Sequence, residues 1–222
     1  MSAQEALFNT TYRAFLFDMD GTVLTSIAAA ERVWATWARR HGVDVETFLP
    51  TIHGARAIDT IRRLGLPGLD AEKEAQWITT AELEDVDGVA EVAGAADFLR
   101  SLPTRQWAIV TSAPRTLALR RMAAAGIPEP EVMVTAEDVS AGKPDPAGYR
   151  LAARRLDVDI SECLIFEDAA VGIQAAEAAG ADVIVITSTH EHPIETPHKT
   201  LLNYAKVTAQ PAPGNRMSLH PI

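Results

Sequence analysis

Short apolar runs alternate with longer amphipathic segments along most of the chain. The runs typical of buried strands are Ala14–Phe17, Trp107–Val110, Val132–Val134, Cys163–Phe166 and Val183–Ile186. Their hydrophobic residues follow one another with little polar alternation, as in parallel strands that helices cover on both faces. The segments with helical spacing are Thr116–Ala125, Pro146–Leu156 and Ala170–Ala179. This pattern predicts an α/β fold with a doubly wound parallel sheet.

One stretch, from about Thr25 to Val92, contains no convincing strand. Its apolar residues predict only helices, at Ile27–His41, Ala57–Leu64 and Ala71–Leu83. A connection of this length exceeds an ordinary loop between two strands. We therefore predict a separate all-helical lobe over residues 25–92, and a sheet domain built from residues 1–24 and 93–222. Near the C-terminus, Pro211–Asn215 predicts a turn or loop.

The composition of the chain limits which binding partners and which cellular compartment we expect for the protein. The chain has 222 residues, 47% of them hydrophobic, and a net charge of −10, which argues against non-specific binding to nucleic acid or to anionic membranes. Its one cysteine, Cys163, allows no intramolecular disulfide, as expected in a reducing cytosol. Met1–Thr11 lacks the pattern of a secretory signal, and apolar runs such as Val183–Ile186 are too short to span a bilayer. We therefore expect a cytoplasmic protein.

Two acidic residues, Asp18 and Asp20, follow the first predicted strand and precede Gly21. Alternation along a continuing strand would put both carboxylates on the same side. Carboxylates this close repel each other and therefore need either a cation or a shared proton. Mg²⁺ fits as the cation, because it prefers oxygen ligands. An exposed acidic turn would explain the pair taken alone.

Two more polar clusters follow later strands. Thr111 and Ser112 come after the second strand and offer hydroxyl and amide donors to a phosphoryl group, although either residue could simply cap the next helix. Lys143 stands between Gly142 and Pro144, and its ammonium could neutralise both a carboxylate and a transferring phosphoryl group. An ordinary turn with a solvated lysine is the alternative for Lys143.

A second acidic pair, Glu167 and Asp168, ends the fourth predicted strand. These acids could complement the dipole of the following helix, but two of them at the mouth of a buried strand favour a metal site. Ligands of open α/β sheets bind at the carboxyl ends of the strands, so the four clusters can converge. Together they meet the needs of phosphoryl transfer, which are positioning and charge stabilisation.

In this order, the motifs closely resemble those of the haloacid dehalogenase-like (HAD) hydrolase superfamily. The matching residues are Asp18 to Thr22, Thr111, Lys143, and Glu167 with Asp168. The resemblance implies a Rossmann-like core and identifies residues 25–92 as the family's helical cap. The length of the cap and the string Ile52–Arg56 resemble the branch of sugar phosphatases, glycerol-1-phosphatases and 2-deoxyglucose-6-phosphatases.

The resemblance implies a Mg²⁺-dependent phosphatase of small sugar, sugar-alcohol or glycerol phosphates. Asp18 would attack the phosphorus and form an aspartyl-phosphate, and Asp20, held by Thr22, would act as general acid and then base. Thr111, the amide of Ser112 and Lys143 would hold the phosphoryl oxygens.

The resemblance also implies a ligand set for Mg²⁺. The side chains of Asp18 and Asp168 and the main-chain carbonyl of Asp20 would hold the ion, with Glu167 in an outer position, through water. The cap would close over the site and set specificity. We expect His53, Arg56 and Glu31 to face the substrate, although Arg56 could instead be a solvated helix residue.

Two rival functions share these motifs. A sugar-phosphate mutase of this kind carries a cap histidine after the first motif, and Ile27–Ala30 offers none. A non-catalytic ligand-binding module should have lost one of the motif residues, and none is missing. We expect a monomer, because a cap already covers the site; the identity of the phosphorylated metabolite stays open.

Overall fold

Six parallel strands form the central sheet of the computed structural model, which describes residues 10–190 and 195–222. Residues 1–9 of the predicted sheet domain lie outside the described part. The strand order is β6-β5-β2-β7-β8-β9. The bounds are β2 Ala14–Phe17, β5 Trp107–Val110, β6 Val132–Val134, β7 Cys163–Glu167, β8 Asp182–Ile186 and β9 Lys199–Leu201. All five pairings are parallel, which confirms the predicted α/β class.

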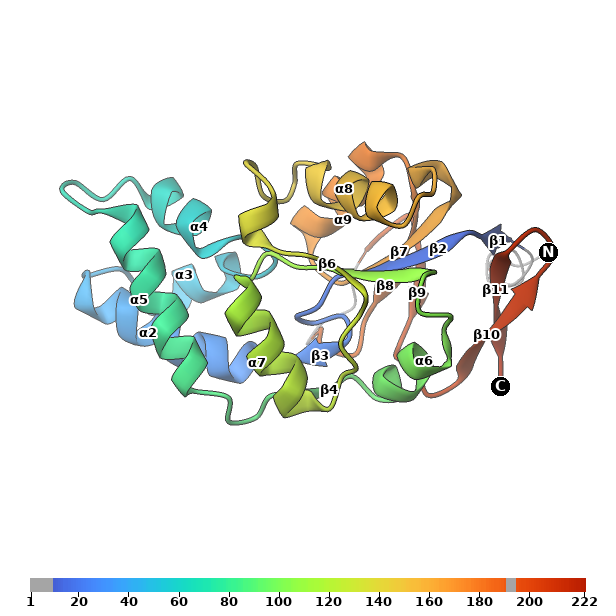
Figure 1. The fold of residues 1–222 in the computed structure, drawn as a ribbon. Helices are drawn as coiled ribbons and strands as arrows, with labels where there is room; N and C mark the ends of the chain where they lie inside the picture. The colour runs from blue at the N-terminus through green and yellow to red at the C-terminus, as the bar shows by residue number, and fades with distance from the viewer. Residues whose placement is uncertain (1–9, 191–194) are drawn as a thin grey trace.

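Helices cover both faces of this sheet (Figure 1). Along β2, Phe15 and Phe17 belong to one hydrophobic cluster, and Ala14 and Leu16 belong to the other. The first cluster includes residues of α6 (Ala95–Ser101) and α7 (Arg115–Ala125), and the second includes residues of α8 (Ala147–Arg155) and α9 (Ala170–Ala179). A strand whose two sets of side chains are both buried reads as an unbroken apolar run, which is why the sequence pattern predicts it well.

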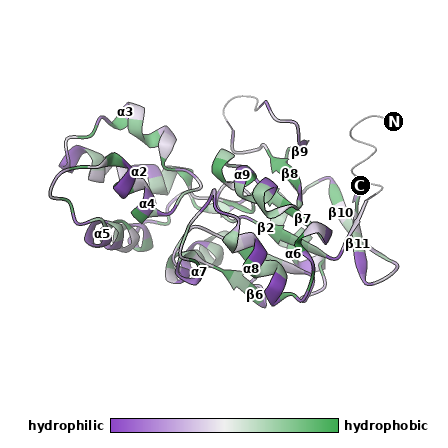
Figure 2. Cartoon of the chain, turned by 90° about the horizontal axis from the view of Figure 1, so that it is seen from above, coloured by the Kyte–Doolittle hydropathy of each residue, from purple (hydrophilic) through white to green (hydrophobic). Residues whose placement is uncertain are grey.

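Four helices between β3 and β4 form a lobe at one end of the molecule (Figure 2). They are α2 (Ile27–Arg40), α3 (Val45–Phe48), α4 (Ala57–Leu64) and α5 (Ala71–Glu84), with the 3₁₀ turn η1 (Leu49–Thr51). The lobe has its own hydrophobic cluster around Trp34, Trp37 and Phe48. Helix α4 ends at Gly65, whose φ of 60° suits a glycine C-cap.

Two short strands, absent from the sequence prediction, join the lobe to the sheet domain. Leu24–Thr25 (β3) pairs antiparallel with Ala90–Glu91 (β4). Strands of two residues are too short to show a repeating pattern of hydrophobic positions, so the sequence does not predict them. They bring the two chain connections of the lobe side by side.

A separate three-stranded antiparallel sheet combines both ends of the described chain. Its order is β1-β11-β10, with bounds β1 Thr11–Tyr12, β10 Val207–Ala212 and β11 Arg216–Pro221. The predicted turn at Pro211–Asn215 is therefore only partly right, because its first two residues end β10. The remaining 3₁₀ turns are η2 (Ala136–Asp138) and η3 (Ile160–Glu162).

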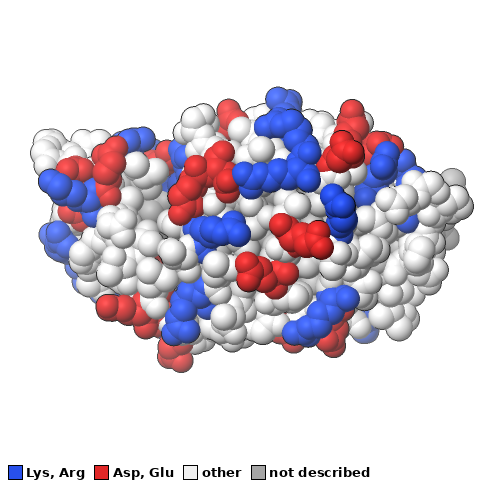
Figure 3. Space-filling model, viewed as in Figure 1, with Lys and Arg blue, Asp and Glu red and all other residues white. Residues whose placement is uncertain are grey.

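Acidic and basic side chains are interspersed on the face that Figure 3 shows. Such mixing offers no broad basic surface to a polyanion on this face. Among the described residues, no helix combines the length and the apolar character that crossing a membrane requires.

Candidate active site

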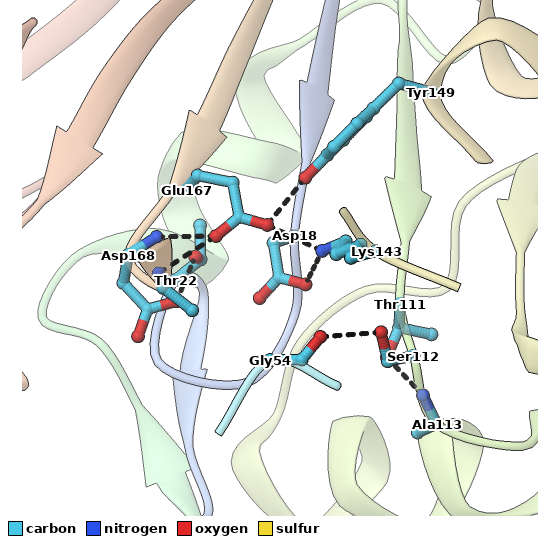
Figure 4. Close-up of polar contacts among 11 residues, drawn as sticks. Asp18, Thr22, Gly54, Thr111, Ser112, Ala113, Lys143, Tyr149, Glu167 and Asp168 are labelled. Atoms are coloured by element: carbon cyan, nitrogen blue, oxygen red, sulfur yellow. Dashed lines mark hydrogen bonds and ion pairs between the residues drawn. The ribbon is translucent and has the colours of Figure 1, made fainter. Parts of the chain in front are cut away.

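Four segments meet at the carboxyl edge of the sheet, where β5, β2 and β7 are neighbours. Asp18 follows β2, Thr111 follows β5, and Glu167 ends β7. Lys143 reaches the same place from the connection between η2 and α8 (Figure 4). Because parallel strands gather their carboxyl ends, groups far apart in the sequence become neighbours here.

The side chain of Lys143 is only 6% exposed and contacts two carboxylates. Its ammonium donates to Oδ1 of Asp18 and, over 2.6 Å, to Oε1 of Glu167. Burial alone would lower the pKa of Lys143, but the two carboxylates raise it above its ordinary value. The ammonium therefore stays charged and provides a fixed cation for an anionic group beside Asp18.

Glu167 is fully buried and accepts four hydrogen bonds. Lys143 and the Tyr149 hydroxyl, the latter at 2.8 Å, donate to Oε1. The backbone amides of Asp168 and Ala169 donate to Oε2 at 2.9 and 3.0 Å. With both oxygens engaged, Glu167 anchors the lysine and the start of α9, and it has little capacity left to bind a metal directly.

Asp18, Glu167 and Asp168 each place a carboxylate oxygen within 4.8 Å of the others. Burial raises the pKa of Asp18 to about 7, although the charge of Lys143 opposes this shift. Burial, and then the charge of Glu167, raise the pKa of Asp168 well above its usual range. One lysine cannot balance three ionised carboxylates, so all three can be ionised together only with a further cation, and the side chains offer it only oxygen ligands. That combination fits Mg²⁺.

Two glycines leave the space that these carboxylates occupy. A Cβ at Gly21 would collide with the carboxylate of Asp168, and a Cβ at Gly172 would collide with that of Glu167. Gly21 also has a φ of 91°, which a side chain would strain. Any larger residue at these two positions would therefore displace the acidic pair.

The second motif makes different contacts from a helix cap. Helix α7 begins at Arg115, and its N-cap residue is Pro114, so neither hydroxyl caps it. Thr111 accepts the amide of Ala113 through Oγ1 at 3.0 Å. Ser112 donates over 2.8 Å to the carbonyl of Gly54, which belongs to the helical lobe. The motif therefore joins the sheet edge to the lobe.

Asp20 lies apart from the acidic cluster, because β2 ends at Phe17 and does not carry the expected alternation onward. Its Oδ1 accepts the Ser26 hydroxyl at 2.6 Å and the Arg121 guanidinium at 3.1 Å. Thr22, expected beside Asp20, instead donates to Asp168 over 3.1 Å. The two aspartates of the first motif therefore have separate surroundings.

A cleft of about 980 Å³ runs between the sheet edge and the lobe. Its lining includes Asp18, Asp20 and Asp168 on the sheet side, and Glu31 and His53 on the lobe side. Nε2 of His53 lies 3.5 Å from Oε1 of Glu31, and both side chains remain more than one-third exposed. These two groups can therefore offer hydrogen bonds to a molecule held in the cleft.

The structure does not bring Arg56 into this cleft. Its guanidinium pairs with Asp59 at 2.6 Å and donates to the carbonyls of Val139 and Ser140 at 3.1 and 3.2 Å. The side chain is only 12% exposed, so it is not a solvated helix residue either. Arg56 instead ties the lobe to the segment that leads to Lys143.

Sequence reasoning missed three polar residues of the site. Tyr149 lies within the predicted helix Pro146–Leu156, where the pattern marks no functional residue, yet its buried hydroxyl donates a hydrogen bond to Glu167. Arg121 and Glu82 form a buried ion pair at 3.1 Å across α7 and α5. No local pattern marks either charge, because their partners lie far away in the sequence.

Comparisons with known proteins show the family to which this chain belongs. Residues 12–180 match a hydrolase family described as haloacid dehalogenase-like hydrolase. Hexitol phosphatase A of Escherichia coli (strain K12) is 40% identical over 83% of this chain and 86% of its own length. 2-Deoxyglucose-6-phosphate phosphatase 2 of Saccharomyces cerevisiae is 35% identical over 79% of this chain and 80% of its own. Among solved structures, a hydrolase from Pseudomonas syringae matches with a TM-score of 0.71 and 26% identity, covering 80% of this chain and 85% of that one.

Proposed function

Because the chain belongs to the haloacid dehalogenase-like hydrolase family as a phosphoric monoester hydrolase, we propose that it dephosphorylates small sugar, sugar-alcohol or glycerol phosphates through Asp18. The observation that carries the proposal is the convergence of Asp18, Lys143 and Asp168 at one edge of the sheet. The substrate class rests on the names of the relatives and on the size and polar lining of the cleft.

In the proposed first step, the Asp18 oxygen that Lys143 does not contact attacks the phosphorus. The bond from phosphorus to the leaving oxygen breaks as an aspartyl-phosphate forms. Lys143, Thr111 and the amide of Ser112 would hold the phosphoryl oxygens, where developing charge needs fixed donors. The lysine is already buried and charged, so it needs no reorganisation during the reaction.

Asp20 would give its proton to the leaving oxygen and then take one from the water that hydrolyses the aspartyl-phosphate. This role suits its position, because it lines the cleft without joining the acidic cluster. The Ser26 hydroxyl and Arg121 hold one of its oxygens and leave the other for proton transfer.

Asp18, Asp168 and the main-chain carbonyl of Asp20 would hold Mg²⁺. The ion would neutralise carboxylate and phosphoryl charge when bound. Glu167 would act on it only indirectly, by positioning Lys143 and the backbone of Asp168.

We further propose that residues 25–92 work as a cap that closes the cleft and excludes bulk water. Glu31 and His53 would bind hydroxyl groups of the substrate from the cap side. Arg56 would hold the cap in place without touching the substrate, since its guanidinium is committed to Asp59 and to two carbonyls.

A phosphate-release screen over phosphorylated sugars, polyols and glycerol, with and without Mg²⁺, tests this proposal. We expect Mg²⁺-dependent release, its loss in Asp18→Asn, and unchanged release in Asp97→Asn, whose carboxylate is 94% exposed on α6. Normal turnover by folded Asp18→Asn would sink the assignment. Binding without release would indicate a ligand-binding module, and an isomeric phosphate as product would indicate a mutase.

A further inference from the structure

Arg121 is a buried cation that contacts the proposed general acid and has no direct contact with the proposed phosphoryl site. It lies on α7, its side chain is 7% exposed, and its guanidinium contacts two carboxylates. One nitrogen donates to Oδ1 of Asp20 at 3.1 Å, and another lies 3.1 Å from Oε1 of Glu82. Burying an arginine is costly unless its charge is paired, so this three-residue arrangement needs an explanation.

The two carboxylates belong to different parts of the molecule. Asp20 follows β2 in the sheet domain, whereas Glu82 lies on α5 in the helical lobe. Helices α5 and α7 lie side by side where the lobe meets the sheet domain (Figure 1). Arg121 therefore connects the proposed general acid to the lobe through a single side chain, and a guanidinium can do this because its donors are fixed in a planar fork.

Among the described residues, the side-chain hydrogen bonds to the Asp20 carboxylate go to one of its two oxygens. Oδ1 accepts both the Ser26 hydroxyl, at 2.6 Å, and Arg121. Two donors from different directions fix the plane of a carboxylate more firmly than one donor does. These two bonds therefore also fix the direction of the second carboxylate oxygen of Asp20. That direction depends on the position of the Arg121 guanidinium.

We infer that Arg121 is a positioning residue: it orients Asp20 for proton transfer and, through Glu82, makes that orientation depend on the docked helical lobe. The inference rests on the proposed function, in which Asp20 protonates the leaving oxygen. It predicts that substitution of Arg121 lowers kcat/KM only for substrates whose leaving group must be protonated.

Two substrates separate that effect from general damage. An alkyl phosphate (glycerol 1-phosphate or sorbitol 6-phosphate) leaves as a poor alkoxide and needs the acid, whereas p-nitrophenyl phosphate leaves as a stable phenolate. The value of kcat/KM reports the steps up to phosphoryl transfer. The ratio of the two kcat/KM values in one preparation is independent of how much enzyme is folded, so a destabilised variant still gives an answer.

We expect Arg121→Met to lower the alkyl-to-aryl ratio by about 10- to 100-fold, which is part of the roughly 100- to 10,000-fold that a positioned acid contributes. Arg121→Lys keeps the charge without the fork and should fall between Arg121→Met and the wild type. Glu82→Gln should lower the ratio in the same direction. Arg120→Met, next along α7 but exposed, should leave it unchanged.

A double-mutant cycle with Asp20→Asn completes the test. If Arg121 acts through Asp20, then Arg121→Met should not change the ratio further in the Asp20→Asn background. An unchanged ratio in Arg121→Met alone, or an equal further loss without Asp20, overturns the inference. If Asp20→Asn itself leaves the ratio unchanged, then the proposed acid is wrong, and the two failures are told apart.

Discussion

Gly54 is a point of close contact between the helical lobe and the sheet domain in the active-site region. Its carbonyl accepts the Ser112 hydroxyl, and its φ is 77°. A Cβ at this position would lie 2.7 Å from Cβ of Ala169 and 2.9 Å from Cγ2 of Val171. Both distances are well inside van der Waals contact, so Gly54→Ala should push the lobe away from the start of α9.

The cost of that collision can be separated from backbone strain. A side chain in the left-handed region costs about 1–2 kcal/mol, and overpacking costs typically about 1–3 kcal/mol. Gly68 in the same lobe has a φ of 74°, and a Cβ there would meet nothing within 4 Å. Gly68→Ala should therefore show the cost of backbone strain without the cost of a collision. The difference between the variants is the collision, which would shift a closed-to-open equilibrium by about 5- to 150-fold.

Steady-state phosphate release and urea unfolding measure the two contributions. We expect Gly54→Ala to lose more free energy of unfolding than Gly68→Ala, by at most about 1–3 kcal/mol, because opening relieves the collision only by giving up the docked contacts. Only Gly54→Ala should lose kcat/KM, by about 5- to 150-fold, with a raised KM as the open lobe binds substrate less well. Equal kcat/KM in the two variants would refute the reasoning that the docked lobe completes the site.

Three further changes test the acidic cluster and the fold. Gly172→Ala should displace the Glu167 carboxylate, costing about 1–3 kcal/mol in urea unfolding and most of the phosphate release; full activity would contradict the role of Glu167. A hydrogen bond from Arg155 lowers the pKa of Asp138 to about 2, so its stabilisation is complete above pH 4 and is lost as the pH falls toward 2. Asp138→Asn should therefore lose about 1–2 kcal/mol of unfolding free energy at pH 7, with the difference shrinking below pH 4; a pH-independent difference would contradict this. Chelation by EDTA should stop phosphate release without changing the circular dichroism, and Mg²⁺ should restore it; turnover in EDTA would count against the metal.

Five of the six strands of the central sheet were predictable because helices cover them on both faces, whereas the partly exposed edge strand β9 was not predicted. Phe15 and Phe17 pack on one side while Leu16 packs on the other, so the run is apolar throughout. The strands β10 and β11 were not predictable in the same way. They pair in a small sheet with exposed and half-buried positions, and Pro211 lies within β10, where a proline argues against a strand.

Three of the four core motifs were predictable for a related reason, because each is contiguous with a strand end, whereas Lys143 lies in the connection between η2 and α8. Topology alone then brings Asp18 and Glu167 together, because β2 and β7 are adjacent. The setting of Arg121 could not be predicted, since it depends on how α7 packs against α5 and β2. In the sequence it is one of two consecutive arginines, and nothing local distinguishes it from the exposed Arg120.

Three polar ties between the lobe and the sheet domain end at or near a residue of the proposed chemistry. The Gly54 carbonyl holds Ser112, and Arg56 holds the carbonyl of Ser140, three residues before Lys143. Glu82 reaches Asp20 through Arg121. A lobe that served only as a lid would need no such distribution of contacts. Because each tie bears on a different catalytic segment, substitutions in the lobe far from the phosphorus should alter turnover as well as affinity, and they should do so most for substrates whose leaving group needs Asp20.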